Sequence, residues 1–203
     1  MSCHPFKHFV TITKHRHQVI RNGMTFGIFW HCLRHDLTKY GWTEFHLSAK
    51  YYAGTYSPVF NERLHNDYFS LICQHHTKRN KHHWEYWTDF LRGRILAKQM
   101  PYVYAVEYVC DVLAASKVYN GKNFTPKVAL DYFMGRKEHY YMAEGTKQFI
   151  SWLLTKYVNE GKKGINKKEM KAKYQEISSK YPEVEVFDII KTDGKPLPEL
   201  IKD

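Results

Sequence analysis

Histidines are concentrated in one short stretch of this chain, residues 75–87. Four of the 13 histidines lie within its first nine residues, and a Trp-Glu-Tyr-Trp segment follows them. Imidazole is the commonest side-chain metal ligand, so the stretch indicates part of a metal site. Its candidate ligands are His75, His76, His82 and His83. These four imidazoles include no bridging anion, so the carboxylates of such a site must come from elsewhere in the chain.

Asp111 is the stronger of two candidates for these carboxylates. It lies within 109–115, the most apolar run of the sequence, where an unpaired carboxylate would cost several kcal/mol or lose its charge. A bound metal would remove that cost; the alternative is that Asp111 faces water or pairs with Lys117 or an arginine. The second candidate is Asp36, which directly follows His35 and can also bridge two ions.

Two more residues complete the set. His15 lies three residues after Ile12, on the apolar side of the first expected helix, whereas His17 falls on the roughly opposite side. Glu107 precedes Asp111 by about one helical turn and shares its face. It either orients a ligand histidine from behind or forms an ordinary salt bridge.

The order of these residues resembles the HD superfamily of metal-dependent phosphohydrolases. Those helical domains carry a histidine, an adjacent His-Asp pair and a distant aspartate, as do His15, His35-Asp36 and Asp111 here. In that superfamily, extra histidines between the pair and the last aspartate accompany a second metal, and 75–83 occupies this interval. The segment His-Asp-Leu-Thr-Lys at 35–39 also resembles the frequent His-Asp-x-x-Lys, which implies a role for Lys39 near phosphate.

Over residues 6–155 the chain is more closely similar to a small uncharacterised bacterial and phage family. Thr38 replaces the serine of the family pattern, and Gly41-Trp42 replaces a Ser-Pro pair; neither change affects a proposed ligand. The matching pieces are His-Asp-Leu-Thr-Lys at 35–39, Glu-Phe at 44–45, Tyr-Tyr-Ala-Gly at 51–54, Ser-Pro at 57–58, the stretch 75–87, Met-Pro at 100–101 and the helix of Asp111 to Gly121.

These resemblances imply a two-metal site. In it Asp36 bridges two ions; His15, His35 and Asp111 complete one of them, and histidines of 75–83 complete the other. Mixed imidazole and carboxylate ligands suit Mn, Fe, Co, Ni or Zn and do not choose among these metals.

Four residues are candidates for substrate contacts. Lys39 and Arg79 are expected at the phosphate oxygens, because charged donors suit phosphate. Asn80 either presents its amide to the substrate or caps the following helix. Trp84 either stacks on a nucleobase or packs in the core.

The expected function is hydrolysis of a nucleotide or another small phosphate ester, by a phosphomonoesterase or phosphodiesterase in which Asp36, Lys39 and Arg79 serve catalysis. Two alternatives use the same residues. One is a di-iron oxygenase on an HD-type scaffold. The other is a non-catalytic protein that binds a nucleotide or nucleic acid and holds metal only for its fold.

Composition fits a globular protein with anionic partners. The 203 residues are 43% hydrophobic and 16% aromatic, enough for one core and a small appendix. The sequence contains no run of about 18 apolar residues, which a membrane span would need. Its start does not resemble a signal peptide. We therefore expect a cytoplasmic location. The formal net charge of +11 favours anionic partners. The lysine run in 156–180 indicates either a solvated helical face or a nucleic-acid patch.

Helices are expected to position the candidate ligands. The alternation in 182–190 predicts one short edge strand or a docked tail. Because helices predominate, the expected fold class is all-α. It consists of an HD-like helical bundle over 1–160 and a lysine-rich helical extension over 161–203. Apolar periodicity and start and stop signals predict helices over about 6–22, 25–36, 43–53, 58–76, 82–96, 102–119, 125–134, 138–158 and 166–180.

Overall fold

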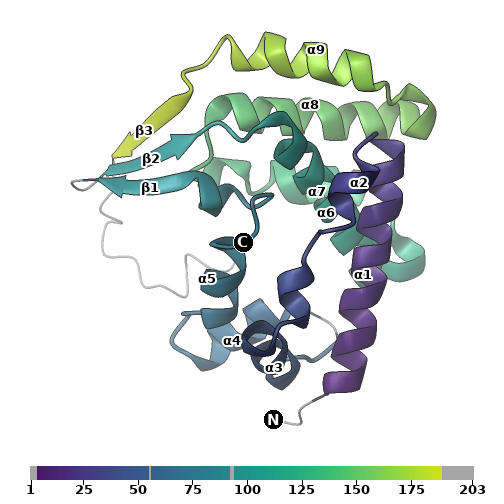
Figure 1. Cartoon of the computed structure of the whole chain (residues 1–203), viewed down its shortest axis with the longest axis vertical. Helices are drawn as coiled ribbons and strands as arrows, with labels where there is room; N and C mark the ends of the chain where they lie inside the picture. Colours follow the sequence, from purple (N-terminus) through teal and green to yellow (C-terminus); the bar gives the residue numbers. More distant parts are fainter. Residues whose placement is uncertain (1–3, 55, 92–93, 189–203) are drawn as a thin grey trace.

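The computed structural model describes residues 4–54, 56–91 and 94–188, and these ranges are mostly helical (Figure 1). The α-helices are α1 (Pro5–Thr25), α2 (Phe29–Cys32), α3 (Trp42–Lys50), α4 (Pro58–His65), α5 (Leu71–Thr77), α6 (Tyr102–Asn120), α7 (Pro126–Met134), α8 (Glu144–Glu160) and α9 (Lys167–Ser178). Five short 3-10 helices are η1 (Leu37–Tyr40), η2 (Trp84–Trp87), η3 (Gly121–Asn123), η4 (Lys137–His139) and η5 (Gly161–Gly164). The all-α class is thereby confirmed, and the HD-like arrangement stays a prediction.

Helix α6 forms the centre of the core. Apolar residues surround nearly its whole circumference, as is typical of a helix buried on most sides. It packs against α1 on one side and α8 on another. Two acidic residues, Glu107 and Asp111, lie on this buried helix, so their carboxylates need partners inside the protein.

Helix α1 buries a stripe of polar and apolar residues, mainly against α6 and also against α2 and α3. Its buried residues follow helical spacing, and they are His8, Ile12, His15, Val19 and Gly23. Gly23 permits close approach of α2, because a Cβ at this position would lie 2.6 Å from Cys32 Sγ. The same approach brings the segment after α2 toward α1.

The predicted helix over 58–76 is interrupted. Helix α4 ends at His65 and α5 begins after Ser70, whose hydroxyl accepts a hydrogen bond from Cys73 N at 2.9 Å. The buried carboxylate of Glu62 accepts from the Ser70 hydroxyl and from Ile72 N at 3.0 Å. This cap fixes where α5 starts, and therefore which of its histidines points inward.

The prediction of a helix over 82–96 is wrong. This segment forms η2 and then a hairpin of β1 (Thr88–Leu91) and β2 (Arg94–Lys98), because its aromatic and β-branched residues suit strands. The edge strand predicted within 182–190 is confirmed as β3 (Val184–Asp188), which pairs antiparallel with β2. The sheet order is β1-β2-β3, so the structure has a small three-stranded sheet where one strand was expected.

The predicted helix over 25–36 is also much shorter. Only α2 is α-helical there, and turns follow it up to η1. Gly27 lies just before α2 and has a positive φ of 71°. This left-handed conformation ends the preceding helix, α1. His35 and Asp36 therefore lie in a turn and not at the end of a long helix.

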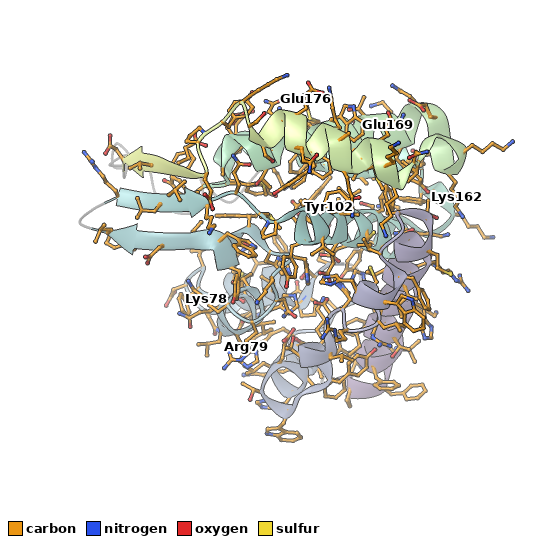
Figure 2. The ribbon with its side chains drawn as sticks, turned by 45° about the horizontal axis from the view of Figure 1, so that its top comes forward. Lys78, Arg79, Tyr102, Lys162, Glu169 and Glu176 are labelled. Atoms are coloured by element: carbon orange, nitrogen blue, oxygen red, sulfur yellow. The ribbon has the colours of Figure 1, made fainter. Side chains whose placement is uncertain are left out.

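Helix α9 lies along α8, on the outer side of the molecule (Figure 1). Met170 and Ile177 on its inner face belong to the same core as α6. Its acidic residues Glu169 and Glu176 pair with lysines of α8, of α9 and of the turn after α9, and Figure 2 shows both acids on α9 with Tyr102 of α6 nearby. The lysine-rich segment thus shares the main core. No helix in the described ranges is long and apolar enough to cross a membrane.

Replacing Met170 by Ala is expected to lower the free energy of unfolding of the whole domain by about 2–5 kcal/mol, because the side chain is fully buried. The measurement is urea unfolding of metal-free protein, followed by circular dichroism and tryptophan fluorescence. The exposed neighbour Lys171→Ala serves as control and should shift stability by about 0.5 kcal/mol or less. Two separate transitions, with only one affected by Met170→Ala, would contradict a shared core.

Candidate metal centre

The structure brings together seven of the eight predicted metal ligands, in two adjoining groups. The first group is His15 from α1, His35 and Asp36 from the turn after α2, and Asp111 from α6. His15 Nε2 lies 2.9 Å from Asp111 Oδ1 and 3.4 Å from His35 Nε2. His35 Nε2 lies 3.2 Å from Asp36 Oδ2. Donors that bind one ion at about 2.0–2.2 Å stand at such separations from one another.

The second group consists of Asp36, His76, His82 and His83. His76 Nε2 lies 3.4 Å and His82 Nε2 lies 3.5 Å from Asp36 Oδ1. The ring centroid of His83 lies 4.6 Å from that of His76 and 4.3 Å from that of His82. Helix α5 and the turn after it thus supply three imidazoles to this group, and two of them face the other oxygen of Asp36.

Asp36 is the residue that both groups share. Its Oδ2 faces the first group and its Oδ1 faces the second, and its side chain is 2% exposed. The backbone of Asp36 is left-handed, with φ 51° and ψ 30°, a conformation that aspartate tolerates better than most residues. Asp36 is therefore placed where it could bridge two cations, and the bridging role stays a prediction.

Several polar atoms of these groups are buried with no hydrogen-bond partner among the described residues. They are Nε2 of His82, Nε2 of His83 and both carboxylate oxygens of Asp36, although Lys39 Nζ lies 2.6 Å from Asp36 Oδ2 as an ion pair. Buried polar atoms are normally satisfied. A divalent cation in each group would supply partners for these lone pairs, so the residues present fit the predicted metals.

Electrostatics also favour cations. Burial alone would raise the pKa of Asp36, but His35 and Lys39 hold it well below its usual value. Burial has the same opposing effect on Asp111, whose pKa His15 and His35 hold well below normal. Both aspartates are therefore ionised. In the absence of metal, burial would lower the pKa of His35, yet Asp36 and Asp111 raise it well above its usual value.

Two further carboxylates stand behind the histidines. Glu107 Oε1 accepts a hydrogen bond from His35 Nδ1 at 2.9 Å, which leaves Nε2 free to face Asp36. Glu44 Oε1, from α3, lies 2.8 Å from His76 Nδ1 in the same relation. Such outer carboxylates fix the tautomer and orientation of ligand histidines. The role predicted for Glu107 fits this geometry. Glu44 was not predicted, although an acidic residue on the inner face of the expected helix 43–53 is a detectable signal.

Lys39 reaches the centre from η1. Burial would lower its pKa, but Asp36 and Asp111 outweigh that effect and raise the pKa above its usual value. The ammonium is therefore charged and lies at the edge of the first group. Its side chain is 27% exposed and that of Asp111 is 16% exposed, whereas the His35 side chain is fully buried. Lys39 and Asp111 are therefore partly open to solvent at the first group, as is His83, 20% exposed, at the second.

Four predicted site residues occupy other positions. His75 lies outside both groups, with Nδ1 3.6 Å from Glu44 Oε2. Arg79 is exposed beside Lys78 after the end of α5 (Figure 2), and its guanidinium reaches the carbonyl oxygen of His75.

Asn80 and Trp84 have structural partners. The Asn80 amide donates to Thr38 Oγ1 and to the carbonyl of His76, both at 2.9 Å, so it ties the turn of Asp36 to α5. It does not act as the predicted helix cap, because the short helix that follows, η2, has His83 at its N-cap. The Trp84 ring stacks on Tyr140 at 5.3 Å between centroids and packs against the core.

A protein-family model described as a family of unknown function (DUF5662) matches residues 4–156. All members of both ligand groups, Glu44, Glu107 and Lys39 lie within that range. No curated protein matches the chain, and no solved structure matches it.

Replacing His76 by Ala is expected to remove one of two bound divalent ions, because this imidazole faces Asp36 Oδ1. Metal analysis of protein made without a histidine tag or chelating resin measures this loss. His75→Ala is the matched control, since the neighbouring ring lies outside both groups, and it should keep the wild-type metal content. Equal losses from both variants, or unchanged content in His76→Ala, would contradict the assignment.

Proposed function

The chain belongs to the family of unknown function DUF5662, and we propose that it is a metal-dependent phosphohydrolase acting on a nucleotide or another small phosphate ester. One observation carries the proposal. The buried carboxylate of Asp36 faces a different group of imidazoles with each oxygen, and the ammonium of Lys39 lies 2.6 Å from it on the solvent side. This combination provides for two adjacent cations and a fixed positive charge beside them.

Phosphoryl transfer needs charge neutralisation and a positioned water. Two divalent ions supply both when bound, because they stabilise the attacking and leaving oxygens of an in-line displacement. The residues that would hold them are those of the two groups, with Asp36 common to both.

Lys39 is the side chain best placed to bind the phosphate. A charged ammonium at the edge of the centre attracts a phosphoryl oxygen as a point charge. It lies on the exposed side, where Asp111 is also accessible. The net charge of +11 favours the approach of an anionic substrate. We therefore assign Lys39 to substrate binding and transition-state stabilisation.

The position of Lys39 favours a hydrolase over the di-iron oxygenase. The same imidazole and carboxylate ligands also suit iron, but a fixed ammonium at the open side has an evident use toward a phosphate. The deep burial of His35 and His82 favours a small ester over a long nucleic acid, because the substrate must reach a centre enclosed on most sides.

Purified protein supplied with Mn²⁺, Co²⁺ or Ni²⁺ is expected to hydrolyse at least one member of a panel of nucleotides, cyclic nucleotides and bis-p-nitrophenyl phosphate. Lys39→Gln should lower kcat/KM by about 100-fold or more, the usual effect of removing one preorganised charge donor, while its metal content stays that of the wild type. Lys39→Arg keeps the charge and should retain more activity than Lys39→Gln.

Two results would count against this proposal. One is an intact panel with every metal, and oxygen consumption by the iron-loaded protein would then favour the oxygenase. The other is a Lys39→Gln variant with wild-type turnover, which would remove Lys39 from the reaction.

A further inference from the structure

Glu107 connects the two ligand groups by a route separate from Asp36. Its Oε1 accepts a hydrogen bond from His35 Nδ1 at 2.9 Å and lies 3.5 Å from His82 Nδ1. His35 belongs to the first group and His82 to the second, and both also lie with Glu107 in a third cluster of potential ligand atoms. In both rings Nδ1 faces Glu107 while Nε2 faces Asp36. A single outer oxygen therefore stands behind one histidine of each group.

His31 holds the other end of this carboxylate. Its Nε2 lies 2.6 Å from Glu107 Oε2, and its ring meets the Tyr104 ring edge-on with centroids 5.1 Å apart. A carboxylate oxygen only accepts hydrogen bonds, so His31 Nε2 is the donor in this contact. His31 is 20% exposed and belongs to neither ligand group.

We propose that Glu107, held in place by His31, orients one histidine of each group, so that the two ion-binding steps depend on the same outer carboxylate. The inference rests on the proposed metal centre. A carboxylate that accepts from Nδ1 fixes the tautomer that leaves Nε2 free for metal. Because the same oxygen serves both rings, its displacement changes both groups. His31 therefore acts through Glu107 and then through a ligand histidine, so it is a positioning residue that would contact neither ion.

Glu44 offers a matched comparison within the same chain. Its Oε1 lies 2.8 Å from His76 Nδ1, and His76 belongs to the second group only. It is a glutamate like Glu107 and buried like it, and each has one carboxylate oxygen within 2.9 Å of the Nδ1 of a candidate ligand. A change at Glu44 should therefore affect one ion-binding step, whereas a change at Glu107 should affect both.

The test is calorimetric titration of Mn²⁺ into the metal-free full-length chain. We expect two binding steps in the wild type. Glu107→Gln should weaken both steps, each by about 10–100-fold, the range known for outer-shell partners. Glu44→Gln should weaken one step by a similar factor and leave the other. Thermal unfolding of the metal-free variants checks that each is folded.

His31 variants test the outer end without touching a buried charge. His31→Phe keeps a ring against Tyr104 but removes the donor, so it should weaken both steps by less than Glu107→Gln does. His31→Gln retains an N–H donor and should recover part of the loss. In neither variant should the change in stability of the metal-free protein scale with the change in Mn²⁺ affinity.

The outcomes separate this inference from the proposed metal centre. A wild type that binds no Mn²⁺ contradicts the centre itself. Two steps in the wild type, with Glu107→Gln weakening only one or His31→Phe weakening neither, overturn the shared role of Glu107 and leave the centre standing. If Glu107→Gln does not fold, the His31 pair decides the question.

Discussion

Asp36 has to satisfy two groups of imidazoles with one buried carboxylate, and the arrangement around it follows from that constraint. Its left-handed backbone turns the side chain between α1 and α5. The Asn80 amide donates hydrogen bonds to Thr38 Oγ1 and to the carbonyl oxygen of His76, and these bonds link the turn of Asp36 to α5. An ionised carboxylate at this depth needs positive partners, and Lys39 alone reaches only one of its oxygens.

Rigid elements carry the rest of the centre. Helix α6, buried on most sides, brings Glu107 and Asp111 to opposite sides of His35, where one orients the ring and the other joins the ligand group. Helix α1 places His15 through the same stripe that packs against α6. Outer carboxylates behind His35 and His76 hold both rings by Nδ1. The core therefore holds each donor in place, so the binding of ions here would require little reorganisation.

The sequence predicts the inward position of residues that have apolar neighbours along a helix. It does not predict positions that depend on where a helix begins, because the start of the helix sets the direction of each side chain. Asp111 was found because a carboxylate in an apolar helix needs a partner, and His15 because of its spacing from Ile12. His75 and His76 could not be separated, because neighbours on a helix point about 100° apart and the phase of α5 depends on its start at Ser70. Trp84 lies in the segment wrongly predicted as a helix. Glu44 is detectable as an acidic residue on an expected helix, but its contact with His76 is set by the fold.

The central claim is that two ions share the carboxylate of Asp36. The metal–metal distance in Mn²⁺-loaded protein, measured by X-ray absorption at the Mn edge, tests it most directly. A shared carboxylate predicts a Mn–Mn separation of about 3.5–4 Å, the range of two-metal hydrolytic sites, and its loss in Asp36→Asn, which tolerates the same left-handed backbone. A spectrum with no Mn neighbour in the fully loaded wild type, or one unchanged in Asp36→Asn, would contradict the claim.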